Sequence, residues 1–158
     1  MTTTPIDAVL NAPVKFTERP SPLPADLRIE WRVAFLLCVL KMTCRGGKSS
    51  LPRLQVINWA ARSADTRKRF LEIVTQGTKA GEIIIRVEPG LNYAIAFAAA
   101  EKFIERPGGD RIQLTDEGKK MVAQIQAAKD CLVEEKAFLT SLGMALTEQL
   151  AKKLLARG

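Results

Sequence analysis

The chain has 158 residues, of which 47% are hydrophobic, 24 are basic and 17 are acidic, and it contains no histidine. Without histidine it cannot form a Ser-His-Asp or Cys-His catalytic set, and it lacks the commonest ligand of transition metals. Its three cysteines have no regular spacing and predict reduced thiols. We therefore expect no catalytic residue, no cofactor and no metal site.

The apolar runs are too short for a membrane anchor. The longest uninterrupted run, Val33 to Leu40, falls far short of the roughly 20 residues of a membrane span. The first residues, MTTTPIDAVLNAP, lack the basic start and long apolar core of a signal peptide. We expect a cytoplasmic protein.

Residues 1–27 predict an extended arm. They contain five of the eight prolines, which remove backbone donors and favour extended backbone in the preceding residue. Apolar residues such as Ile6 and Phe16 predict that this arm lies along its own domain or along a partner.

Residues 28–130 predict the main domain. A first helix, about Asp26 to Met42, is apolar on nearly every face and should be the buried centre of the fold. A flexible basic loop, Thr43 to Ser50, should follow. Two further helices should begin at Ser49 or Ser50, and at Ser63, because serine is a preferred N-cap.

The second half of this domain predicts short strands between helices. The β-branched residues Ile83 to Val87 predict a strand, and a helix should run from Pro89 to about Phe103. Two strands, Ile104 to Arg106 and Arg111 to Leu114, should form a hairpin. Thr115 should cap the next helix, and Gly118 should let that helix pass close to a neighbouring backbone.

Residues 131–158 predict a C-terminal amphipathic helix. Leucines recur every four residues as one stripe, which favours burial in the chain or contact with a partner. The stripe consists of Leu142, Leu146, Leu150 and Leu154. The order of all elements predicts a mainly α protein with a small antiparallel sheet, specifically a winged helix-turn-helix.

The positive charge is concentrated in one stretch. Residues 41–69 carry 8 basic residues and 1 acidic residue, a net +7, and the rest of the chain carries 16 of each sign. Such an excess indicates contact with a polyanion, although a solvated helix face would also account for it. The residues we expect to contact DNA phosphates are Arg45, Lys48, Arg53, Arg62, Arg67, Lys68 and Arg69, together with Arg106 and Arg111 of the hairpin.

The predicted helix before the hairpin does not resemble a base-reading helix. Base reading needs Arg, Lys, Asn or Gln at the groove, whereas this helix has a second apolar face that includes Tyr93 and Phe97. That face predicts a protein partner, unless the arm or the C-terminal helix covers it. We assign partner binding to Tyr93, Phe97 and the four leucines of the C-terminal stripe.

Three segments carry a family resemblance. SLPRLQVINWAARS (50–63), VEPGLNYAIAFAAAEKFIER (87–106) and RIQLTDEGKKM (111–121) resemble the middle component of bacterial ABC-three-component systems, which include the small subunit of Lamassu-type antiphage defence complexes. This resemblance spans roughly residues 28–130. More distantly, the chain looks like the winged-helix subunits of condensin-like SMC complexes. The resemblance implies a non-catalytic subunit bound to an SMC/Rad50-like ATPase and, in Lamassu, to an effector nuclease.

The sequence thus leads to one main functional hypothesis and two alternatives. The main one is an accessory subunit of an antiphage complex that binds an SMC/Rad50-like ATPase through apolar surfaces and double-stranded DNA without sequence preference. The first alternative is a transcriptional regulator of the winged-helix class that forms a homodimer through its C-terminal helix. The second is a small enzyme subunit, which the missing histidine disfavours.

Overall fold

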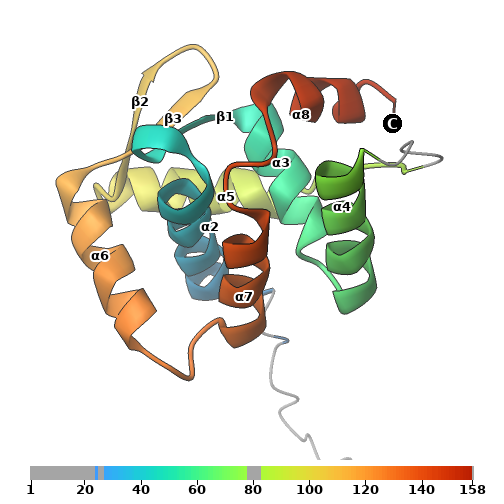
Figure 1. Cartoon of the computed structure of the whole chain (residues 1–158). Coiled ribbons are helices and arrows are strands. Elements are labelled where there is room, and N and C mark those ends of the chain that lie inside the picture. The colour runs from blue at the N-terminus through green and yellow to red at the C-terminus, as the bar shows by residue number, and fades with distance from the viewer. Residues whose placement is uncertain (1–23, 25–26, 78–82, 158) are drawn as a thin grey trace, which may run out of the picture.

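The computed structural model describes residues 24, 27–77 and 83–157, so most of the predicted arm lies outside the described residues. Within them the chain is mainly helical, with seven α-helices, a 3-10 turn and one three-stranded antiparallel sheet (Figure 1). This confirms the mainly α prediction. The helices are α2 (Ile29–Thr43), α3 (Leu51–Ala60), α4 (Ala64–Gln76), α5 (Pro89–Ala100), α6 (Asp116–Ala127), α7 (Val133–Leu142) and α8 (Glu148–Leu155). The turn and strands are η2 (Arg45–Gly47), β1 (Lys48–Ser50), β2 (Ile104–Gly108) and β3 (Arg111–Leu114).

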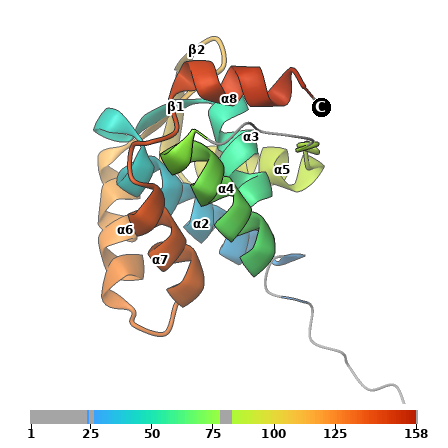
Figure 2. The ribbon, with the colours of Figure 1, turned by 45° about the vertical axis from the view of Figure 1, so that its right-hand side comes forward.

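Helix α2 is the centre of the molecule, as predicted. Its apolar residues surround the helix axis, and Leu37, Cys38 and Leu40 are completely buried. It contacts α3, α5, α6, α7 and β3, so each of its faces packs against a different element (Figures 1 and 2). It begins at Ile29 rather than at Asp26, which lies outside the described residues. No described helix combines the length and apolar character needed to cross a membrane.

The sheet uses a different third strand from the one predicted. The hairpin strands β2 and β3 form as expected, but β1 pairs with β3 to give the order β1-β3-β2. The prediction of a flexible loop there is wrong, because Gly46 and Gly47 both adopt positive φ and turn the chain from α2 toward β3. The segment 83–87 contains no helix, turn or bend and forms no strand pairing with a described residue.

The helix starts after β1 and after β3 follow from local capping. Ser50 Oγ accepts a hydrogen bond from Arg53 N at 3.3 Å, and Thr115 Oγ1 accepts one from Gly118 N at 3.1 Å. Gly118 is required for close packing, since a Cβ there would lie 2.0 Å from the carbonyl oxygen of Phe103. The expected role of Gly118 is therefore confirmed.

The C-terminal segment is two helices rather than the single helix predicted. Gly143 has φ 49° and ψ −134°, a conformation that only glycine adopts easily, and it ends α7. Thr147 then caps α8, which packs on α3. Leu142, Leu146 and Leu154 are at most 4% exposed within this chain. They belong to its core, so their assignment to a partner surface is wrong; Leu150 is half-buried.

Candidate partner and nucleic-acid interfaces

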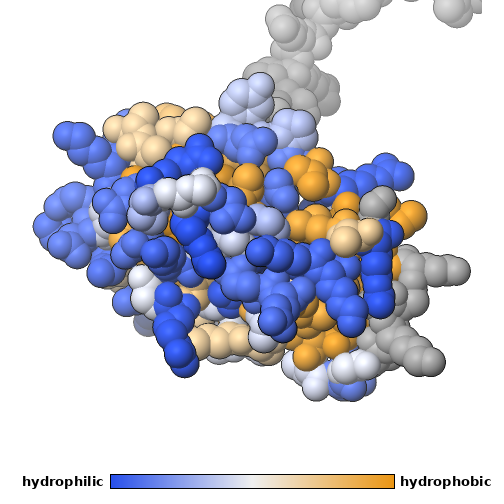
Figure 3. Space-filling view, turned by 90° about the horizontal axis from the view of Figure 1, so that it is seen from above, coloured by the Kyte–Doolittle hydropathy of each residue, from blue (hydrophilic) through white to orange (hydrophobic). Residues whose placement is uncertain are grey.

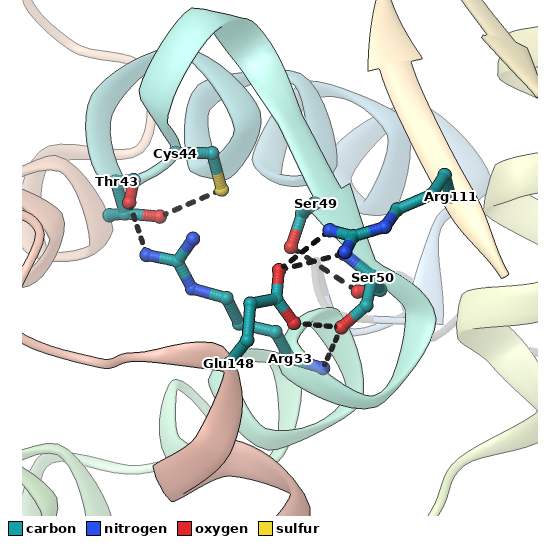
Figure 4. Close-up of polar contacts among 7 residues, drawn as sticks. All are labelled: Thr43, Cys44, Ser49, Ser50, Arg53, Arg111 and Glu148. Carbon is teal, nitrogen blue, oxygen red and sulfur yellow. Dashed lines mark hydrogen bonds and ion pairs between the residues drawn. The ribbon is translucent and has the colours of Figure 1, made fainter. Parts of the chain in front are cut away.

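Arg53 is a structural residue, and its assignment to DNA contact is wrong. Its side chain is buried, and its Nη2 donates to the carbonyl oxygen of Thr43 at 2.5 Å (Figure 4). Thr43 is the last residue of α2, so the guanidinium binds the negative end of that helix dipole. Arg53 forms no ion pair with a described residue, so this helix end is the acceptor for its buried charge, while its Nε has no hydrogen-bond partner among the described residues.

Three other arginines expected at DNA are engaged with carboxylates of the chain. A phosphate would have to compete with these carboxylates, which lowers the free energy available for DNA binding. The pairs are Arg62 Nε with Glu88 Oε1 at 3.1 Å, Arg67 Nη2 with Glu134 Oε2 at 2.6 Å, and Arg111 Nη1 with Glu148 Oε1 at 3.4 Å.

The remaining five expected cations are exposed and form no ion pair with a described residue. They do not form one patch. One group lies at η2 and β1, immediately before α3, and another lies on α4, immediately after α3 (Figure 1). Because α3 has 10 residues, its ends are about 15 Å apart. The groups are Arg45 and Lys48 before α3, Lys68 and Arg69 after it, and Arg106 on β2.

A polar cluster around Glu148 was not found from the sequence. Its carboxylate accepts hydrogen bonds from Ser50 N at 3.1 Å and from Ser50 Oγ, and it pairs with Arg111 (Figure 4). The cluster therefore joins α8 to β1, to the start of α3 and to β3. The positive end of the α3 dipole further stabilises the carboxylate. Only the fold reveals it, because residue 50 and residue 148 are far apart in the sequence.

A second polar cluster fixes the start of α5. Glu88, which precedes the helix, accepts hydrogen bonds from Arg32 Nη1 at 3.3 Å and Asn58 Nδ2 at 3.4 Å and pairs with Arg62. These partners come from α2, from α3 and from the turn after α3. A cavity of about 190 Å³ adjoins the cluster, with Trp31 in its lining. Side chains from α2, α3 and the following turn thus bind Glu88 and fix the N-terminal end of α5.

Helix α5 has one buried and one exposed apolar face. Leu91, Ala94, Ile95 and Ala98 are at most 5% exposed, whereas Tyr93 is 71% and Phe97 is 43% exposed. The C-terminal helix α8 does not cover the exposed face of α5, because it packs on α3 instead. No charged residue occurs in the twelve residues of α5.

A groove runs beside the exposed face of α5. It has a volume of about 330 Å³ and lies between α5, the start of α3 and β2. Leu51, Ile95, Ala96 and Ala99 supply an apolar lining, and Asn92 and Arg106 supply polar atoms. This lining suits a ligand that places an apolar side chain next to a hydrogen-bonding group.

The cysteines are free thiols, in keeping with the sequence-based expectation. Burial raises the pKa of the Cys38 thiol to about 11, so it stays protonated at neutral pH. The described ranges contain no group of three or more His, Cys, Asp or Glu residues able to hold a metal ion. Searches of protein-family models, curated proteins and solved structures found no match to this chain.

Proposed function

We propose that this chain is a non-catalytic accessory subunit of a bacterial antiphage defence complex, with a winged helix-turn-helix fold. It binds an SMC/Rad50-like ATPase through the exposed face of α5 and contacts DNA phosphates without reading sequence. The order of α2, β1, α3, α5 and the β2–β3 hairpin supports this fold, with α4 as an additional helix between α3 and α5. The resemblance of three segments to ABC-three-component middle subunits supports the choice of partner.

The observation that carries the proposal is the outer face of α5. A helix in this place before a hairpin presents polar side chains when it reads bases in the major groove. Here Tyr93 and Phe97 are exposed, and the helix carries no charge. Aromatic residues that are exposed in the free chain are typical of protein interfaces, where they contribute most of the binding energy.

The packing of α5 on the rest of the chain suits a docking surface. Its inner face is buried against α2, and the Glu88 cluster fixes its first turn. A partner that binds α5 therefore meets a helix that is already ordered, and it loses little free energy in ordering the site.

The first experiment identifies the partner. Tagged chain is purified from its native host, and bound proteins are identified by mass spectrometry. We expect an SMC/Rad50-like ATPase, and we expect Tyr93→Ala combined with Phe97→Ala to abolish its recovery. Met144→Ala combined with Val133→Ala is the matched control, because these two side chains are equally exposed but lie away from α5. A free homodimer that binds one operator tightly would instead establish the regulator alternative.

The second experiment tests DNA. Five exposed cations allow a slope of log affinity against log salt of at most about −4.5. Lys68→Gln with Arg69→Gln should reduce that slope by about 1.8, equally for every duplex sequence, because each charge contacts phosphate only. Discrimination between sequences by several kcal/mol would contradict this part of the proposal.

A further inference from the structure

The segment Ile83–Val87, which connects α4 to α5, has an unusual combination of properties. Four of its five residues are β-branched, and its backbone contains no helix, turn or bend, so the chain runs straight there. Yet its backbone forms no hydrogen bond with any described residue, in contrast to β1, β2 and β3. A sequence suited to a strand thus runs straight without a neighbouring strand among the described residues.

Burial alternates over the first four residues of this segment and ends at Val87. Ile83 and Ile85 are 9% and 5% exposed and anchor the segment in the core, whereas Ile84 is 61% and Val87 is 50% exposed. The anchored side chains hold the backbone in place. A straight segment that is anchored by its side chains, and whose backbone is unpaired among the described residues, leaves backbone groups that a second strand can join, as at the edge of a sheet.

The surroundings of the segment specify what kind of strand would fit. A cavity of about 210 Å³ beside it is lined by Trp59, Thr66, Arg69, Ile83 and Ile84. On the face seen in Figure 3, apolar side chains gather among hydrophilic ones on the right-hand part, the side on which Figure 1 shows α4 and α8.

The cations near this cavity are available to a partner. Lys68, Arg69 and Arg86 are exposed and have no ion pair with a described residue. Arg86 belongs to the segment itself, and Arg69 lines the cavity. The site therefore combines an apolar hollow with positive charge.

We propose that Ile83–Val87 is a docking edge for an extended acidic segment of a protein partner, which adds to it as a β-strand. An apolar side chain of that segment enters the cavity, and its carboxylates face Arg69 and Arg86. A second copy of this chain fits less well, because pairing two such edges would bring their cations together. This surface is separate from the exposed face of α5 but shares Arg69 with the proposed DNA contacts, so a strand bound here would compete with DNA for that side chain. Its test needs neither the ATPase nor DNA.

The probe is a ten-residue synthetic peptide that alternates Val and Glu, with a Val and Lys peptide as the control. Hydrogen exchange of the backbone amides of residues 83–87 is measured with and without peptide. We expect fast exchange in the free full-length chain and at least tenfold slower exchange with the acidic peptide only. Three results would overturn the proposal: slow exchange in the free chain, which would mean that the chain covers this edge itself; no slowing by the acidic peptide; or equal slowing by both peptides.

Charge reversal separates specific docking from general attraction. Arg69→Glu with Arg86→Glu should weaken binding of the acidic peptide at least tenfold and should let the lysine peptide bind instead. Lys152→Glu with Lys153→Glu is the matched control, because these exposed cations lie on α8. The melting temperature of each variant verifies that it folds. An equal loss of affinity in both double variants would reduce the effect to net charge and would contradict the proposal.

Discussion

Helix α5 and the C-terminal segment look alike in the sequence but differ in space. Both have apolar residues at helical spacing, and in both these residues cover more of the helix surface than one core-facing side requires. In the C-terminal segment, Leu142 and Leu146 are buried in the core, whereas Tyr93 and Phe97 of α5 are exposed. Gly143 and the Glu148 cluster account for the difference, because the chain bends at residue 143 and α8 is then held on α3. Apolar periodicity therefore predicts that a face will be covered, but it does not say by what.

The strongest test of this comparison is to place a charge at a buried and at an exposed position just after the C-terminal bend. Leu146→Asp should lower the free energy of unfolding by at least about 3 kcal/mol, because it removes a buried leucine and buries a carboxylate. Met144→Asp, two residues earlier and 60% exposed, should cost less than about 0.5 kcal/mol. Urea denaturation of both variants gives the two values. Similar losses would show that the whole segment is packed.

The bend itself is tested at Gly143. Gly143→Ala should destabilise the fold by about 2 kcal/mol, since its backbone conformation is strained for any residue with a Cβ. Gly77→Ala is the control, because Gly77 has the ordinary left-handed conformation of a helix end and should cost only about 1 kcal/mol. If thermal melting ranked the two in the opposite order, the bend would not depend on the glycine.

The attachment of α8 is tested at Glu148. Glu148→Ala removes the acceptor for Ser50 and the partner of Arg111, and should cost about 1–2 kcal/mol. Amide exchange should rise throughout α8 but remain unchanged in α5. Unchanged protection of α8 would mean that leucine packing alone holds this helix, and the explanation given for the difference from α5 would need revision.

The smallest effect on stability is expected on α5. Tyr93→Ala should change the free energy of unfolding by less than about 1 kcal/mol, because Tyr93 is 71% exposed and most of the removed surface is already in water. Phe97, at 43% exposed, is the more packed of the two rings. The urea midpoint of the Tyr93→Ala variant measures this change directly. A loss of several kcal/mol would show that the Tyr93 ring is packed in solution, and it would remove the basis for a partner surface on α5.

Local signals in the sequence predicted much of the fold. Ser50, Ser63 and Thr115 cap the helices they were expected to cap, and Gly118 provides the close approach of α6 to Phe103. The hairpin and the central position of α2 were also predicted correctly. These features depend on residues a few positions apart, or on the overall apolarity of one helix, so the sequence is sufficient to specify them.

Features that depend on distant pairing were not predicted. The third strand is β1 rather than residues 83–87, because the fold places β1 beside β3, with which it pairs. Of the nine cations assigned to DNA, Arg53 is buried, and Arg62, Arg67 and Arg111 pair with acids far away in the sequence. A list of charges does not show which of them the fold has already neutralised.

The sequence by itself determined the helical character of this protein, its buried central helix, its hairpin and most of its helix starts. Periodicity, capping and glycine conformation are properties of neighbouring residues, which explains that success. Only the tertiary structure decided which apolar faces are covered, which cations remain exposed, and that the strand-like segment Ile83–Val87 has no partner among the described residues. Those outcomes depend on which elements meet in space, and that is a property of the packed chain as a whole.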